Sequence, residues 1–149
     1  MKERVMKCRV AVDEIVRDDE IIFHEEKDFV FVPSYKVLER IMYKLGFNYI
    51  GCVRSSEELT CIYADNYKNS VMLEIFPANF EIEGGDFKME IPWLAVKKDV
   101  LLYDSYSQSI SRVNLSQYLK FFENRIEEIP KRIRNFLDKK RKISELIYI

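Results

Sequence analysis

The sequence contains few of the side chains on which most enzyme active sites depend. Its 149 residues include one histidine, His24, one threonine and two glutamines. General acid–base catalysis most often uses histidine, but no nucleophile or orienting carboxylate can be assigned to His24, which we expect at the surface or at a sheet edge. Phosphate loops of the Walker or GxGxxG type are absent. These absences favour a protein that is not an enzyme and that needs no cofactor.

Metal-binding patterns are also lacking. The three cysteines, Cys8, Cys52 and Cys61, form no CxxC pair, and a single histidine is available to join them. A structural zinc site needs four such ligands at short spacings, so the sequence predicts no metal site. The acidic run Asp18–Glu20 is more typical of a solvated turn than of a cation site.

Long apolar runs and a net charge are missing too. The first 28 residues alternate charged residues with short apolar pieces, unlike a signal peptide or a transmembrane helix. We therefore expect a cytoplasmic protein that has no membrane partner. The net charge of −1, with 33% charged residues, gives no overall attraction to nucleic acid, so any anion-binding role must be local. The excess of lysine and glutamate over amide side chains predicts a thermophilic source.

The residues that are present predict one domain built mainly from strands. An apolar content of 48% suits a single core. Alternation from Met6 to Val12 predicts a strand, and the apolar runs Ile21–His24 and Phe29–Val32 predict a hairpin. Ser34 as the N-cap and Gly46 after the last turn then bound a helix.

Two further hairpins follow from the turn residues. Closing the polar loop after Arg54 places Cys52 opposite Cys61, where the two cysteines form either a disulfide or a pair of buried thiols. Gly84-Gly85 suits a two-residue turn. That turn places Ile82 opposite Phe87 and Phe80 opposite Met89 on the buried face, with an acidic outer face.

The C-terminal segment carries a heptad-like apolar seam. Asn114 and Gln117 have the spacing of a capping box, and Pro130 is expected to kink or divide the helix that follows. We therefore predict an α+β fold, a mostly antiparallel β meander packed by one central helix and a long, Pro-kinked C-terminal helix. Residues 1–114 form the core domain. Residues 115–149 form an amphipathic segment that either belongs to this domain or extends it for oligomerisation.

An overhanging helix of this kind needs a partner, most simply the same helix of a second copy. The alternative is that the seam packs on the sheet of its own chain. The side chains predicted for a dimer interface are Phe122, Ile126, Ile129, Ile133, Phe136 and Leu137.

Charge is unevenly spread along the chain. Residues 13–28 contain eight acids and two bases, and residues 131–142 contain seven bases and one acid. The two segments are either solvated or face each other, or the basic one binds nucleic acid. The candidate nucleic-acid contacts are Lys97, Lys98, Tyr103, Tyr106, Arg112, Lys131, Arg132, Arg134, Lys139, Lys140 and Arg141.

Part of the chain resembles the later half of a minimal nucleotidyltransferase domain. The segments that carry the resemblance are Asp28–Pro33, the helix through Leu45-Gly46-Phe47, the strand Val71–Phe76, and Glu90-Ile91-Pro92. The resemblance implies Asp28 and Glu74 as metal ligands. The Gly-Ser phosphate loop is missing and Val30 stands where a second acid is expected, so the resemblance implies a degenerate domain. The sequence thus favours a self-associating interaction module, with a nucleic-acid-binding protein and a degenerate nucleotidyltransferase-like protein as alternatives.

Overall fold

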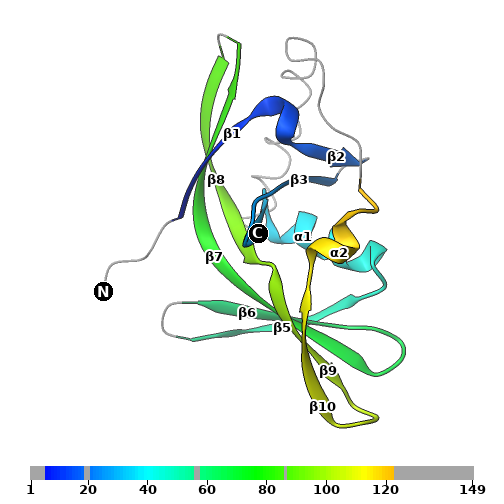
Figure 1. Cartoon of the computed structure of the whole chain (residues 1–149). Coiled ribbons are helices and arrows are strands. Elements are labelled where there is room, and N and C mark those ends of the chain that lie inside the picture. The colour runs from blue at the N-terminus through cyan, green and yellow to red at the C-terminus, as the bar shows by residue number, and fades with distance from the viewer. Residues whose placement is uncertain (1–5, 19–20, 56–57, 86, 123–149) are drawn as a thin grey trace.

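A computed structural model of the chain describes residues 6–18, 21–55, 58–85 and 87–122. Of these residues, 62% lie in strands and 15% in helices, so the α+β prediction is wrong and the fold is mostly antiparallel β. Figure 1 shows a strongly curled sheet with two helices inside the curl. The elements are β1 (Met6–Ala11), the 3-10 turn η1 (Val12–Glu14), β2 (Val16–Asp18), β3 (Ile21–Glu25), β4 (Phe29–Val32), α1 (Tyr35–Lys44), β5 (Asn48–Arg54), β6 (Leu59–Ala64), β7 (Asn69–Gly84), β8 (Phe87–Lys97), β9 (Asp99–Asp104), β10 (Ser109–Asn114) and α2 (Ser116–Leu119).

Strand β7 is the spine of the sheet, and its two halves have different neighbours. Residues 70–75 pair with β6 and residues 69–72 with β9, whereas residues 78–83 pair with β1 and residues 75–84 with β8. On one side of β7, the change from β6 to β1 falls at Phe76 and Pro77. Proline lacks a backbone donor and would interrupt a continuous ladder, so this break lets β7 run straight through Pro77.

The curled sheet has a hydrophobic core on each face. The first core joins α1, α2 and the inner face of the sheet, and it includes Leu38, Ile41 and Leu73. The second core lies under β1 and η1, and it includes Ile22, Phe80 and Trp93. Both faces of β3 are therefore covered, which explains why Ile21, Ile22, Phe23 and His24 are all buried.

Helix α1 confirms the helix predicted between Ser34 and Gly46. The Ser34 hydroxyl accepts a hydrogen bond from the Val37 N–H at 3.2 Å, and Gly46 takes a positive φ of 97°, as a C′ glycine does. The buried stripe includes Val37, Leu38 and Ile41. The opposite face of the helix is consequently left to polar residues.

The long C-terminal helix is a second correction. Helix α2 has four residues, and a turn at Lys120 and Phe121 follows it. The Asn114 side chain accepts from the Ser116 N–H at 2.9 Å, and the N-cap residue is Leu115, without a side-chain cap. Leu115, Leu119 and Phe122, at the start of the predicted apolar seam, are buried in the first core. The boundary after residue 114 therefore does not separate two cores.

The hairpin at Gly84 has its predicted faces but a different register. Ile82 pairs with Met89 and Phe80 with Ile91, and Gly84 pairs with Phe87, so the glycines are not the two central residues of the turn. A shift of two residues preserves which side chains point inward. Strand β8 also continues through Pro92, which lies opposite Asn79.

Candidate functional site

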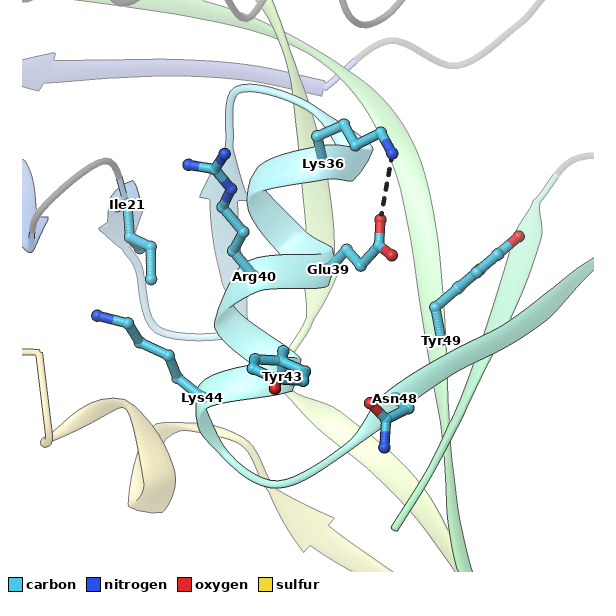
Figure 2. Close-up of a pocket in the computed structure, with 8 residues that line it drawn as sticks. All are labelled: Ile21, Lys36, Glu39, Arg40, Tyr43, Lys44, Asn48 and Tyr49. Atoms are coloured by element: carbon cyan, nitrogen blue, oxygen red, sulfur yellow. Dashed lines mark ion pairs between the residues drawn. The ribbon is translucent and has the colours of Figure 1, made fainter.

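A cleft of about 600 Å³ opens between α1, the start of β3 and the start of β5. Figure 2 shows its lining side chains. They are Ile21, Lys36, Glu39, Arg40, Tyr43, Lys44, Asn48 and Tyr49. Three of these eight residues are cations and one is an acid, so the lining has a positive balance in a protein whose net charge is −1.

The cations form one row along α1. Lys36, Arg40 and Lys44 follow each other at intervals of four residues, which places them on one helix face with a rise of about 6 Å between successive side chains. This is the face opposite the buried stripe, so the amphipathic pattern of α1 dictates the row.

Lys36 and Lys44 each have an acidic neighbour among the described residues. The Lys36 Nζ lies 3.8 Å from the Glu39 carboxylate, and the Lys44 Nζ lies 3.5 Å from the Asp18 carboxylate. Exposed ion pairs of this kind contribute about 0–1 kcal/mol. An anionic ligand can therefore compete with Glu39 and Asp18 for these ammonium groups.

Two tyrosines, Tyr43 and Tyr49, line the cleft together with these cations. Tyr43 is 69% exposed at the end of α1, and Tyr49 comes from β5 on the other side of the cleft. The Tyr49 ring packs edge-on against Tyr63 at 5.6 Å between centroids. Burial, followed by the charge of Glu39, raises the pKa of Tyr63 well above its usual range, so Tyr63 stays neutral beneath the cleft.

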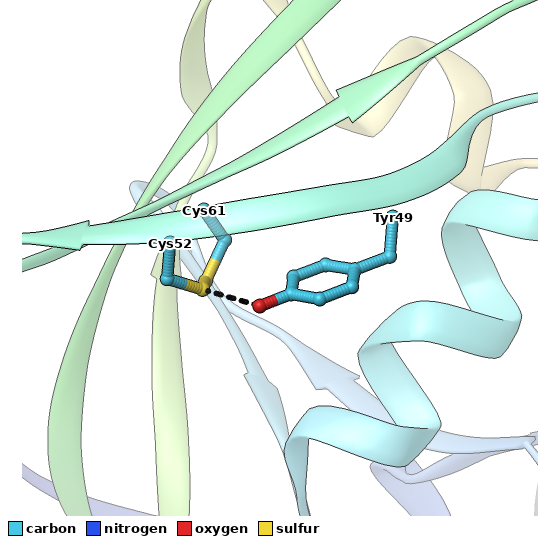
Figure 3. The surroundings of a disulfide bond; sticks show 3 residues. All are labelled: Tyr49, Cys52 and Cys61. Atoms are coloured by element: carbon cyan, nitrogen blue, oxygen red, sulfur yellow. Dashed lines mark hydrogen bonds between the residues drawn. A yellow bond between two sulfur atoms is a disulfide. The ribbon is translucent and has the colours of Figure 1, made fainter.

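The β5–β6 hairpin holds Tyr49 in place. Cys52 and Cys61 lie directly opposite each other, which confirms the predicted register, and of the two predicted alternatives the structure has the disulfide. As Figure 3 shows, the Tyr49 hydroxyl points at this bridge, and it donates to the Cys52 Sγ at 3.3 Å. One wall of the cleft is thus tied to a cross-linked pair of strands.

The nucleic-acid contacts predicted after β8 do not form a common site. Lys98 is buried with its Nζ 2.5 Å from the Glu25 carboxylate, and Arg112 pairs with Asp99 at 2.9 Å. Tyr106 is exposed, with the Lys68 Nζ 6.0 Å from its ring centre, and Tyr103 is partly buried in β9. The predicted contacts Lys131, Arg132, Arg134, Lys139, Lys140 and Arg141 lie outside the described residues.

The remaining predicted site residues are also dispersed. Phe122, predicted for a dimer interface, packs inside its own chain with its ring 5.8 Å from that of Phe23. The other predicted interface residues, Ile126, Ile129, Ile133, Phe136 and Leu137, lie outside the described part of the chain. Glu74 has Lys97 as an ionic neighbour at 3.9 Å, and Asp28 lies in the turn before β4. The described residues contain no metal-ligand group that joins Asp28 to Glu74, and their role as ligands stays a prediction.

His24 was misassigned to the surface. It is 4% exposed, its Nε2 lies 2.7 Å from Glu26 Oε1, and the Cys8 thiol donates to the same oxygen at 3.6 Å. The hydrogen bond from His24 lowers the pKa of Glu26. Burial and the nearby Glu26 carboxylate raise the pKa of Cys8 to about 12, so the thiol is protonated at neutral pH.

The sequence contained a signal for the cleft that our prediction missed. The spacing of Lys36, Arg40 and Lys44 opposite the apolar stripe was readable from the helix period. The position of β5 across from that row was not readable from the sequence, because it depends on how the sheet curls.

Among the described residues, no helix combines the length and the apolar character needed to cross a membrane.

Comparison with known proteins does not place the chain in a family. No protein-family model matches the chain, and no curated protein and no solved structure matches it either.

Proposed function

We propose that the protein binds single-stranded nucleic acid in the cleft between α1 and β5. The observation that carries the proposal is the row of Lys36, Arg40 and Lys44 facing an opening that also presents Tyr43 and Tyr49. Single strands are typically held by cations that follow the backbone and by aromatic rings on which bases stack. Both elements are present on one face of α1 and on the strand beside it.

The local charge explains how such binding fits an almost neutral chain. The overall charge of −1 provides no long-range attraction, so affinity depends on the contacts within the cleft. Each phosphate neutralised by a cation releases counterions, and the affinity then falls with salt. Tyr43, as the more exposed ring, is the principal stacking candidate.

Fluorescence anisotropy with a labelled twelve-nucleotide oligothymidine tests the proposal. The triple variant Lys36→Gln, Arg40→Gln, Lys44→Gln should bind at least tenfold more weakly and lose about two units of the slope of log affinity against log salt. Tyr43→Ala should lose about 1–3 kcal/mol without changing that slope. Lys7→Gln, which removes a cation from β1 outside the cleft, is the matched control.

Three results would overturn the proposal. One is no binding at about 50 mM salt, where phosphate contacts are strong. Another is a triple variant that binds as well as the unmodified chain while circular dichroism shows the same fold. The third is equal competition by a mononucleotide and by the oligonucleotide, which would assign the cleft to a small nucleotide ligand.

A second candidate function is self-association through β5. Within the described part of the chain β5 pairs with β6 alone, and its Ile50 and Val53 side chains are exposed. An open strand edge with apolar side chains is a template for pairing with another chain. Light scattering should show a dimer that Val53→Lys disrupts, whereas Ile110→Lys on β10, which is also exposed, should not. The reverse outcome, or a monomer before any change, excludes β5 as the interface.

A further inference from the structure

We infer that Cys8, His24 and Glu26 bind a divalent transition-metal ion, most suitably Zn²⁺. The thiol sulfur, the imidazole nitrogen and a carboxylate oxygen all lie within 4.8 Å of one another. They come from β1, from β3 and from the turn after β3, and they lie beside the second core. The described residues contain no other group of three metal-ligating side chains.

His24 is held as a metal-binding imidazole needs to be. Its ring packs against Phe31, at 6.3 Å, and against Phe80, at 5.7 Å between ring centres, and Phe80 in turn stacks on Trp93 at 4.1 Å. The Nδ1 atom is 3.4 Å from the Glu14 carbonyl oxygen. A carbonyl only accepts, so Nδ1 keeps its proton, and a metal ion at Nε2 replaces the proton that Nε2 shares with the Glu26 carboxylate.

Nε2 is also the atom that faces Glu26, and the same carboxylate oxygen faces Cys8. Glu26 Oε1 is 2.7 Å from Nε2 and 3.6 Å from the Cys8 Sγ. Donor atoms about 2.1 Å from a tetrahedral zinc ion lie about 3.4 Å apart. The Sγ to Oε1 distance already fits, and the Oε1 to Nε2 distance has to open by about 0.7 Å. The Glu26 side chain is largely exposed, so a small rotation of its carboxylate provides that opening.

The donor set selects the class of ion. A thiolate, an imidazole and a carboxylate are ligands that zinc accepts together, whereas magnesium and calcium prefer oxygen ligands alone. Two anionic ligands balance the two charges of the ion. Three protein ligands leave a fourth position for water or for a further ligand, as in zinc sites that are not purely structural.

Cobalt(II) titration tests the site, because Co²⁺ substitutes for Zn²⁺ and reports its ligands by absorption. The full chain, treated with a chelator and free of any histidine tag, should bind one equivalent with a sulfur-to-cobalt charge-transfer band in the near ultraviolet. Zn²⁺ should displace Co²⁺ and remove the band. The bonded pair Cys52–Cys61 does not contribute a thiolate, so the band reports Cys8.

Variants separate the site from adventitious binding. Cys8→Ser should abolish the charge-transfer band, and Glu26→Gln, at an exposed position, should weaken Co²⁺ and Zn²⁺ binding at least tenfold while leaving the fold intact. Glu83→Gln, which changes a half-exposed carboxylate on β7 that lies 3.6 Å from the Arg9 Nε, should bind like the unmodified chain. The inference is overturned if no ion binds at micromolar protein, if the cobalt spectrum lacks a sulfur band, or if Glu26→Gln and Glu83→Gln bind equally well.

Discussion

Lys98 is a charged side chain inside the fold, and it shows how one residue can join three segments. Its Nζ pairs with the Glu25 carboxylate. Its backbone N–H donates to the Asp28 carbonyl at 2.9 Å, and its own carbonyl accepts from the Leu115 N–H at 2.8 Å. The turn before β4, the turn after β8 and the start of α2 are therefore tied to one position. The sequence predicted both Lys97 and Lys98 as nucleic-acid contacts, because the contacts that bury Lys98 come from residues distant in the sequence.

Removing the acid should destabilise the protein more than removing the base. Glu25→Gln leaves the Lys98 ammonium buried without a counter-charge, and we expect a loss of about 2 kcal/mol in the free energy of unfolding. Lys98→Met removes the buried charge itself and leaves Glu25 near solvent, so the loss should be below about 1 kcal/mol. Urea denaturation measures both losses, with Glu83→Gln at a half-exposed ion pair as the control. Equal losses in the two variants would contradict this account of the pair.

The contribution of Asp65 to the free energy of unfolding should depend on pH. Its burial would raise its pKa, but hydrogen bonds from the side chain and backbone of Asn69 and from the Tyr67 N–H lower the pKa below the usual 3.8. Because the folded pKa is the lower one, the contribution is present above about pH 4 and is lost as the pH falls through the folded pKa. Asp65→Asn should cost up to about 1 kcal/mol at pH 7. Denaturation curves at pH 7 and pH 3 should show that the difference in the free energy of unfolding between the unmodified chain and Asp65→Asn is smaller at pH 3. The same difference at both pH values would contradict this account of Asp65.

At the scale of elements, the β5–β6 hairpin is closed by a covalent bond. The Cys52–Cys61 bridge spans nine residues, and the chain-entropy model assigns such a loop about 2–3 kcal/mol. Unfolding under reducing conditions should therefore occur at a lower urea concentration. Cys8→Ser should keep this sensitivity to reductant, whereas Cys52→Ala should remove it. In denatured, unreduced protein we expect one reactive thiol, from Cys8, and three reactive thiols would exclude the bridge.

Elements with local signals were predictable, and elements that depend on distant partners were not. Ser34 and Gly46 bounded α1 because caps act within one turn, and the loop after Arg54 fixed Cys52 opposite Cys61. The parallel pairing of β1 with β7 joins positions 72 residues apart, such as Cys8 and Phe80, and no local pattern encodes it. The metal-ligand group escaped prediction for the same reason, because β1 carries Cys8 to His24.

At the scale of the whole molecule, β7 connects the two cores, and the curl of the sheet that encloses α1 also creates the proposed binding cleft.

The predicted apolar seam beyond Phe122 lies outside the described residues, so the test of it is the oligomeric state of the protein. If the residues from Ile126 to Leu137 mediate self-association, a chain that ends at Phe122 should contain fewer copies per particle by light scattering than the full chain. The same number of copies, above one, in both chains would exclude the seam and leave the β5 edge as the remaining interface candidate.

Phe122 closes the first core, and the residue before it, Phe121, is an exposed phenylalanine. Phe122 is 5% exposed and contacts Phe23 edge-on, whereas Phe121 is 78% exposed. Phe122→Ala should destabilise the full chain by about 3 kcal/mol through the lost burial and the cavity left behind, and Phe121→Ala by less than about 0.5 kcal/mol. A chain ending at Tyr118 lacks both Leu119 and Phe122, and we expect it to lose most of a typical stability of about 5–15 kcal/mol. Urea denaturation and near-ultraviolet circular dichroism distinguish it from the chain ending at Phe122; equal midpoints would show that α2 does not close this core.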